Sequence, residues 1–260
     1  MNRYLTIWWT FTKNATQHNF TSRFGAFVLV VGKIIRFFFF FFFLLIIGTK
    51  TKAIASYTLA QMIFFFLTYQ LIDTIPQFLM RSVYRFRGDI VSGDFDYYLV
   101  RPFSPLFRAL FGWTDALDIP MIILSVAFLI ISIHQMGNVS SSSVFLYSVF
   151  VANALLIAIA IHIMILAMGV MTTEIDNATM FYRDLTQMGR VPVDIYKEPL
   201  RGFITFVIPV GIMMTIPAKA LFGIVSWQVA VAAFAFSMFF LFLGMKLWER
   251  ALKEYASASS

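Results

Sequence analysis

The polar residues that could do chemistry in this chain are few and lie far apart. Carboxylates inside or beside apolar stretches could transfer protons, and Asp73, Asp115 and Asp118 are of this kind. The chain has no HExxH, GxSxG or GxxxxGK[ST] motif. A membrane-embedded enzyme that uses these carboxylates, or a proton-coupled carrier, is therefore an alternative reading. We favour a structural role, in which the carboxylates pair with Arg81, Arg85 or Arg108.

The histidines give no pattern of a metal centre. His18, His134 and His162 are expected near an interface, on the outer side and in the middle of a membrane, so they cannot share one ion. The chain has no cysteine, which excludes disulfides and Cys-ligated metals. We expect neither a metal nor a cofactor in this chain, and His162 is expected to hydrogen-bond a neighbouring helix or line a wet cavity.

The elements that must position these groups are six apolar stretches. Sixty per cent of the residues are hydrophobic and 13% are charged, which is not the composition of a soluble domain. A bilayer core needs about 20 apolar helical residues. The sequence therefore predicts an all-α polytopic membrane protein with six transmembrane helices. The stretches cover residues 27–48, 53–80, 109–133, 143–171, 203–223 and 225–247.

The basic residues indicate how the spans are oriented. With the N-terminus in the cytoplasm, the outer side keeps only Lys50, Lys52 and Lys219, and most other Lys and Arg residues face the cytoplasm. This asymmetry follows the positive-inside rule. The net charge of +7 is then a topology signal and not a nucleic-acid footprint. We expect a multi-pass protein of the plasma or inner membrane with both termini cytoplasmic and with lipids as neighbours.

The chain divides into three parts. Residues 1–26 mix aromatic and basic side chains and are predicted to form an interfacial helix. Residues 27–247 form the membrane domain, with inner loops at 81–108 and 172–202, and residues 248–260 form a cytoplasmic tail.

The fifth apolar stretch contains residues that interrupt helices. Pro209, Gly211 and Pro217 fall within it, and broken helices are tolerated in membranes where protein or water satisfies the freed backbone groups. We expect a shorter span followed by a re-entrant piece on the outer side.

The first inner loop carries helix-capping and helix-ending residues. Gly88 and Gly93 could act as hinges, Asp89 and Asp94 could cap helices, and Pro102 ends any helix before it. A short amphipathic helix is expected around 94–100. Both inner loops are suited to meet a partner at the cytoplasmic face, and a solvated connection that touches lipid headgroups is the alternative.

Two stretches resemble a known family. The segment Ile90-Val-Ser-Gly-Asp-Phe-Asp-Tyr-Tyr-Leu-Val-Arg-Pro-Phe-Ser-Pro-Leu-Phe107 resembles the first inner loop of ABC-2 family export permeases. The stretch from Phe203 to Gly223, with Phe-Val-Ile-Pro-Val-Gly at its centre, resembles the fifth span of that family. The six-span layout agrees over almost the whole chain. One departure is Tyr196-Lys-Glu-Pro199, where relatives often place Tyr and Pro adjacent.

The resemblance implies a six-span permease subunit with a type V exporter-like fold. Such a subunit pairs with a second copy or a sister permease and docks two ABC ATP-binding subunits, which hold the ATP and Mg²⁺. It would export a lipid, drug, peptide or glycan-like substrate, and the sequence leaves that choice open. No residue is expected to be a chemical catalyst. The resemblance assigns ATPase coupling to Gly88, Asp89, Gly93, Asp94, Asp96, Tyr97, Arg101 and Pro102, and the outer gate to Pro209, Gly211 and Pro217.

Overall fold

The protein is built of α-helices joined by short turns. The computed structural model describes residues 3–50, 56–137, 139–172 and 175–255. Within these ranges there is no strand element, and the predicted all-α class is confirmed. Lys52 and residues 256–260 of the tail lie outside the described residues. The long helices are α1 (Arg3–Asn19), α2 (Arg23–Lys50), α3 (Leu59–Leu79), α7 (Ile119–Gln135), α8 (Ser141–Thr172), α9 (Ile175–Gln187) and α12 (Trp227–Glu254).

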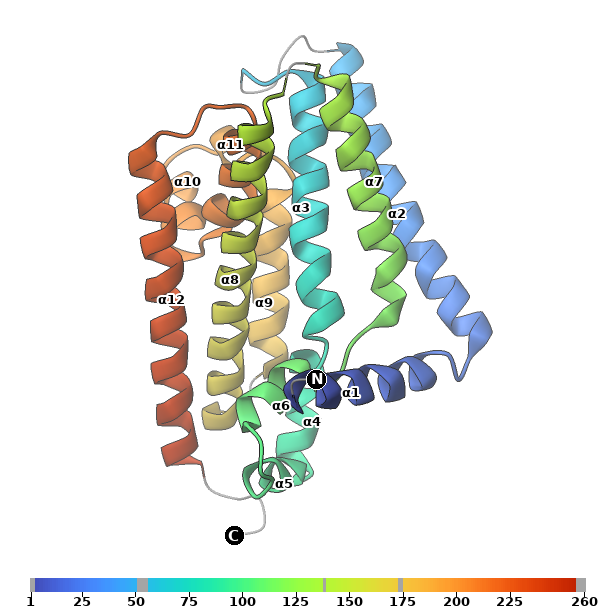
Figure 1. Cartoon of the computed structure of the whole chain (residues 1–260), viewed down its shortest axis with the longest axis vertical. Coiled ribbons are helices and arrows are strands. Elements are labelled where there is room, and N and C mark those ends of the chain that lie inside the picture. The colour runs from blue at the N-terminus through green and yellow to red at the C-terminus, as the bar shows by residue number, and fades with distance from the viewer. Residues whose placement is uncertain (1–2, 51–55, 138, 173–174, 256–260) are drawn as a thin grey trace.

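Shorter elements fill the two ends of the bundle. Near one end lie η1 (Val83–Arg85), α4 (Phe86–Val91), α5 (Asp94–Leu99), α6 (Pro105–Phe111) and η2 (Ala116–Asp118). The remaining short elements are η3 (Met188–Arg190), η4 (Val193–Ile195), α10 (Leu200–Gly202), η5 (Phe203–Val207), η6 (Gly211–Thr215) and α11 (Ile216–Leu221). We call the end with α4 and α5 the lower end and the end with α10 and α11 the upper end, as drawn in Figure 1.

Five helices are long and apolar enough to cross a membrane. They are α2, α3, α7 together with η2, α8 and α12, and a sixth candidate is the pair Leu200–Val207 and Gly211–Leu221, bent by 81°. These agree with the predicted polytopic membrane fold. The bent pair falls on the stretch whose prolines predict a broken helix.

Helix α8 is the central helix of the bundle. Its residues Ala154, Ala158 and Ala160 are fully buried, and small side chains let neighbouring helices approach closely. A Cβ atom added to Gly244 of α12 would lie 2.9 Å from the carbonyl oxygen of Ala160. The α8–α12 contact is therefore backbone against backbone, and the two helices run side by side over most of their length (Figure 1).

The N-terminal segment forms helix α1, which lies across the lower end of the other helices (Figure 1). Its rings pack on α6, with the centroids of Tyr4 and Phe107 4.9 Å apart. At the other end of α1, the Asn19 side-chain amide donates to Asp115 over 3.2 Å. The helix predicted in residues 1–26 is therefore present over Arg3–Asn19. Its location at a membrane interface stays a prediction.

The fifth crossing of the bundle differs from the prediction. Ile175, at the start of α9, lies against Gly169 near the lower end. Asp194, at the far end of this segment, accepts a hydrogen bond from Tyr57, just before α3 begins at the upper end. The chain from α9 through η3 thus runs the length of α3, although residues 172–202 are predicted to form one inner loop. Hydropathy misses this crossing because α9 is short and polar.

The bent pair is a hairpin and not a crossing. Arg201 near its start and Lys219 near its end both form ion pairs with Asp194, over 3.3 and 2.7 Å. Both ends of the hairpin therefore lie at the upper end of the bundle. The predicted assignment of Arg201 and Lys219 to opposite sides of the membrane is wrong, and the re-entrant piece takes up the whole stretch.

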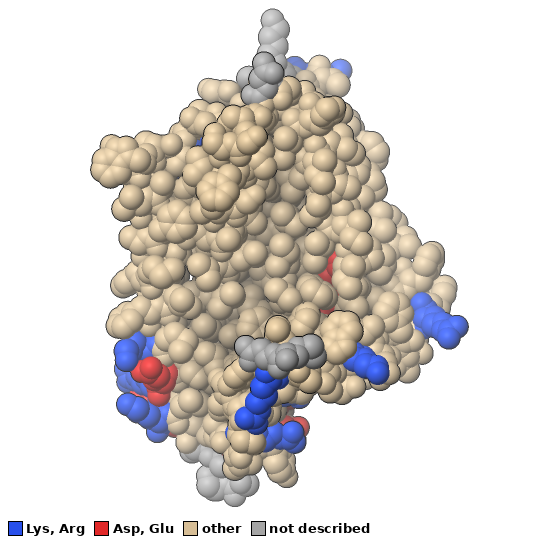
Figure 2. Space-filling model, viewed as in Figure 1, with Lys and Arg blue, Asp and Glu red and all other residues tan. Residues whose placement is uncertain are grey.

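Charged side chains gather at the lower end of the molecule. Figure 2 shows Lys and Arg clustered around the ends of α12 and α4–α5, with an almost uncharged surface above them on this face. This distribution is the one that the positive-inside rule requires if the lower end is cytoplasmic.

Candidate functional site

Helices α4 and α5 form a compact unit at the lower end. Gly93 joins them with a φ of +79°, in the left-handed region that favours glycine. The Ser92 hydroxyl donates to the Asp94 carboxylate over 2.7 Å, next to the start of α5. The turn between the two short helices is therefore fixed by residue types that the sequence shows directly.

Aromatic packing holds this unit on the ends of α8 and α12. Phe95 is fully buried, with its ring 5.2 Å from Phe86 and 5.0 Å from Tyr255. The Tyr255 hydroxyl donates to Asp96 over 3.0 Å. Because the unit is packed from several sides, it can move only together with the spanning helices to which it is attached.

A half-buried carboxylate ties the two short helices together. The Tyr98 hydroxyl donates to Asp89 over 2.6 Å. Burial raises the pKa of Asp89 above its ordinary value, although the Tyr98 hydrogen bond and the charge of Arg108 act in the opposite direction. Burial and this hydrogen bond also raise the pKa of Tyr98. Asp89 therefore links α4 to α5 and is not a free group for a partner.

The opposite face of the unit presents apolar side chains to the outside. Tyr97 is 63% exposed and Val100 is 79% exposed, and Val91 and Leu99 are exposed beside them. Large exposed apolar residues that cluster at one end of a protein mark an interaction surface. We call Val91, Tyr97, Leu99 and Val100 the lower apolar tip.

The predicted coupling residues divide into three groups. Asp89, Asp94, Tyr97 and Arg101 line one cavity of about 240 Å³ that α1 closes through Phe11. Gly88 lies within α4 and Gly93 in the turn between α4 and α5, and neither would meet a neighbour if a Cβ were added. Asp96 faces α12 through Tyr255, and Pro102 lies in the bend after α5.

The second candidate region is the hairpin at the upper end. Pro209 lies in its bend, where it has no N–H to donate, and Pro217 lies in the first turn of α11. A Cβ atom on Gly211 would lie 2.7 Å from the Thr205 hydroxyl. The glycine is therefore needed for the two arms to approach each other. Pro209 and Gly211 lie at the bend, whereas Pro217 lies farther along the second arm.

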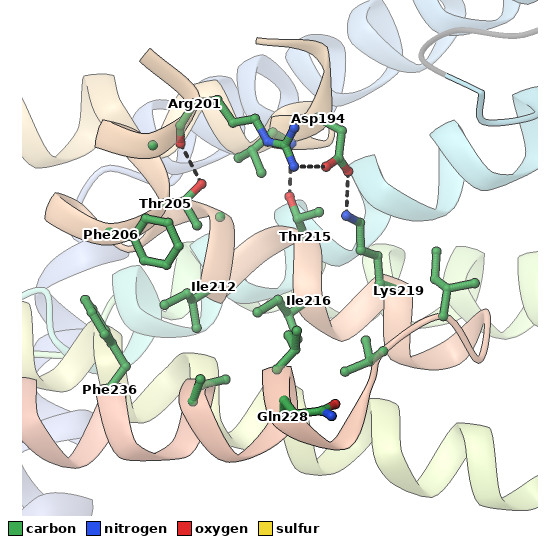
Figure 3. A pocket seen from close by; sticks show the side chains of 18 of the residues that line it. Asp194, Arg201, Thr205, Phe206, Ile212, Thr215, Ile216, Lys219, Gln228 and Phe236 are labelled. Carbon is green, nitrogen blue, oxygen red and sulfur yellow. Dashed lines mark hydrogen bonds and ion pairs between the residues drawn. The ribbon is translucent and has the colours of Figure 1, made fainter. Parts of the chain in front are cut away.

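One carboxylate closes the hairpin. Figure 3 shows the ion pairs of Asp194 with Lys219 and Arg201. Asp194 also accepts a 2.8 Å hydrogen bond from Tyr57. Burial alone would raise the pKa of Asp194, but the hydrogen bonds from Lys219 and Tyr57 and the nearby positive charges lower it below its usual value. Asp194 stays ionised and holds both arms against the start of α3.

A cavity of about 560 Å³ separates the hairpin from α12. Most of its lining is apolar, and Figure 3 shows Phe206, Ile212 and Ile216 of the hairpin opposite Phe236 of α12. Gln228 and the Asp194 cluster supply polar groups at its edge. A cavity of this size and character can hold an apolar chain or ring system with one polar end.

The carboxylates at the lower rim are held in ion pairs. Lys33 of α2 lies 2.6 Å from Asp118 and 3.7 Å from Asp115, and Arg81 lies 3.7 Å from Asp115. The predicted pairing with Arg81 is confirmed, whereas Lys33 is a partner that the sequence does not reveal. Two other proposed partners stack on rings instead, since Arg85 lies over Trp113 and Arg108 over Phe11.

Comparison with protein families adds an independent finding. The family model described as "ABC-2 family transporter protein" matches residues 34–259. The chain belongs to the ABC-2 transporter family. No match was found among curated proteins or among solved structures. The match covers the spans, the α4–α5 unit and the hairpin, so this ABC-2 permease is a membrane protein of a transporter and not a membrane-embedded enzyme.

Two tyrosines of the permease were missed by sequence reasoning. His162 is buried in α8, where its ring lies 3.4 Å from the Tyr84 hydroxyl and 2.7 Å from the Ala158 carbonyl oxygen. The predicted hydrogen bond to a neighbouring element is confirmed, but Tyr84 carries no signal in the sequence. Tyr57 was also missed, since it belongs to a loop whose partner lies far along the chain.

Proposed function

We propose that this chain is the permease subunit of an ATP-driven exporter, and that α4–α5 transmits motion from a separate ATP-binding subunit. The observation that carries the proposal is the combination of a rigid inner face with an exposed apolar tip. Buried rings fix the unit to α8 and α12, and Tyr97 and Val100 remain available for a partner.

The mechanism follows from rigid-body motion. A partner that closes on ATP and Mg²⁺ would push the lower apolar tip, and the tight packing of α5 on α12 would pass the displacement along the bundle. Since α12 and the hairpin line the same upper cavity, the displacement would reach the upper end. In an assembly of two permease chains and two ATP-binding subunits, the second permease chain would undergo the same motion by symmetry.

The substrate class is proposed from the lining of the bundle. The upper cavity suits a lipid, an amphipathic drug, a peptide or a glycan with an apolar anchor. The proposed direction is export from the cytoplasm, with the lower end and both termini on the cytoplasmic side of the plasma or inner membrane.

The experiment is affinity purification of the tagged chain from native membranes, followed by mass spectrometry. We expect a stoichiometric subunit that contains a GxxxxGK[ST] phosphate loop. The double variant Tyr97→Ser, Val100→Ser should lose this subunit while it still inserts and folds. Lys253→Ser, an exposed change at the end of α12, serves as the matched control and should retain it.

Two results would contradict the proposal. A chain that purifies folded and without any ATP-binding subunit would favour a proton-coupled carrier. An ATP-binding subunit that is retained equally by the double variant would remove the lower apolar tip from the interface.

A further inference from the structure

Three arginines surround one carboxylate on the face formed by α2, α3 and the fifth crossing. Arg36 comes from α2, Arg183 from α9 and Arg190 from η3, and they line a shallow depression with Asp73 of α3. Figure 1 shows α3 between α2 and α9, so the three helices bring together residues far apart in the sequence. Tyr69, Gln77 and Gln187 complete the lining.

In the described part of the chain, carboxylates balance only part of the positive charge of this cluster. Asp73 accepts a 2.7 Å hydrogen bond from Gln77, and Arg190 donates to Gln187 over 3.1 Å. In the part of the chain that the structure describes, Arg36, Arg183 and Arg190 form no ion pair with any carboxylate. The cluster thus differs from Asp115, Asp118 and Asp194, each of which lies within ion-pair distance of a cation.

Two members of the cluster, Arg36 and Asp73, also lie on helices that are long and apolar enough to span a membrane, above the paired carboxylates of the lower rim. Lys33, which pairs with Asp118 at the start of α7, precedes Arg36 by three residues, or about 4.5 Å along the helix. The backbone N–H of Asp115 donates to the carbonyl oxygen of Phe78 in α3. Asp73 precedes Phe78 by five residues, which places it about 7.5 Å closer to the upper end. Arg36 and Asp73 are therefore above the paired rim carboxylates, and Arg183 and Arg190 line the same depression.

Exposed charges at this depth require a polar neighbour. Arg36 and Arg183 are exposed on the surface of the single chain, yet charged side chains in membrane segments face a water-filled cavity or a charged partner and not lipid tails. Three guanidinium groups facing one carboxylate leave two positive charges that an anion can neutralise. Arginine also matches the geometry of phosphate oxygens through paired N–H donors.

We propose that Arg36, Arg183 and Arg190 form a binding site for a phosphate-type anion, either a phosphodiester headgroup or a soluble phosphorylated molecule. The depression between them has only about 10 Å³ of free space, so the anion lies at its mouth, bridged by the two exposed arginines. The site extends the proposed function, because a phosphate-bearing molecule bound here would be the cargo of the permease. The binding itself requires no ATP-binding subunit.

The test uses the full chain purified in a mild neutral detergent, without partner subunits. Native mass spectrometry measures binding of phosphatidylglycerol against phosphatidylcholine, and sodium pyrophosphate is the soluble probe. The test variant is Arg36→Gln, Arg183→Gln. The control, Arg87→Gln, Arg250→Gln, removes the same charge from exposed positions at the lower end.

We expect the unmodified chain and the control to bind phosphatidylglycerol about tenfold more tightly than phosphatidylcholine, and the test variant to lose about tenfold for each arginine. Competition by pyrophosphate identifies a soluble anion as the ligand, and its absence identifies a lipid headgroup; either result supports the site. The variant Arg36→Lys, Arg183→Lys keeps the charge without the paired donors and should bind with intermediate affinity. Such binding would also show that a chain changed at these two positions still folds.

Unchanged binding by the test variant, or equal binding of the two lipids together with no binding of pyrophosphate, would overturn the site. Loss of the ATP-binding subunit in the purification experiment would instead contradict the proposed function and leave these measurements unaffected. The two proposals therefore fail separately.

Discussion

Asp194 and Lys219 form a 2.7 Å ion pair that joins the end of the fifth crossing to the last helix of the hairpin. The same carboxylate binds Arg201 and Tyr57. One side chain therefore connects the hairpin, the fifth crossing and the loop before α3. This arrangement makes the upper end a single unit that depends on one negative charge.

The first prediction concerns that charge. Asp194→Asn removes the ionic partner of two cations and should lower the free energy of unfolding by about 2 kcal/mol, the usual range for hydrogen bonds to charged groups. Thermal unfolding in detergent measures the loss. Asp176→Asn is the matched control, because Asp176 and its partner Arg87 are both more than half exposed, and such pairs contribute about 0.5 kcal/mol.

The pH dependence of this contribution has a definite sign. Since the folded protein lowers the pKa of Asp194, its contribution is present above about pH 4 and is lost as the pH falls through the still lower folded pKa. Equal losses in Asp194→Asn and Asp176→Asn would contradict a structural role for the cluster.

The fifth crossing shows what hydropathy can and cannot predict. For the four spans before it, most of the predicted ends fall within a few residues of the observed ends. Long apolar runs have few alternatives in a membrane protein. Helix α9 carries Asp176, Arg183 and Asp184, so its composition resembles that of a loop. The hairpin is apolar enough to imitate a span, and only the contact of Arg201 and Lys219 with one carboxylate reveals its shape.

The candidate site at the lower end was more predictable. Glycine, serine and aspartate act locally, so the turn at Gly93 and the short helix after it follow from the sequence, whereas α4 was not predicted. The ties to Tyr255 and Trp248 join residues at opposite ends of the chain. No local pattern predicts such ties, because they depend on where α12 ends relative to α5.

The second prediction concerns Asp89 at the lower end and the pH dependence of stability. Burial raises the pKa of Asp89, so the folded protein keeps a proton that the unfolded chain has released. Stability therefore falls as the pH rises from about 4 through the folded pKa. Asp89→Asn should flatten this part of the profile and leave stability at pH 7 equal or higher, since the amide oxygen still accepts from Tyr98. Unfolding measured between pH 4 and 8 tests this, and an unchanged slope would be evidence against it.

The third prediction concerns helix packing. Gly244→Ala would bring a methyl group to 2.9 Å from the Ala160 carbonyl oxygen, a backbone atom that cannot move aside without shifting α8. We expect stability to fall by about 1–3 kcal/mol, as in other overpacked cores. Gly32→Ala in α2 is the control, because nothing lies within 4 Å of its added methyl group. Helix propensity should raise its stability by up to about 1 kcal/mol. A smaller loss in Gly244→Ala than in Gly32→Ala would rule out a close α8–α12 contact.

The last prediction separates the residues that hold the α4–α5 unit from those that it offers to a partner. Phe95 is fully buried among Phe86, Trp248 and Tyr255, so Phe95→Ala leaves a cavity and should cost about 3–5 kcal/mol. Tyr97 is 63% exposed, and Tyr97→Ala should change the stability of the isolated chain by less than about 0.5 kcal/mol. The two aromatic residues are two positions apart on one short helix, so local helix propensity affects both alike. If Tyr97→Ala destabilised the isolated chain as much as Phe95→Ala, Tyr97 would belong to the internal packing and could not serve as a free contact. If only Phe95→Ala destabilises it, the inner face of α5 is structural and its outer face is left for a partner, which we propose to be the ATP-binding subunit.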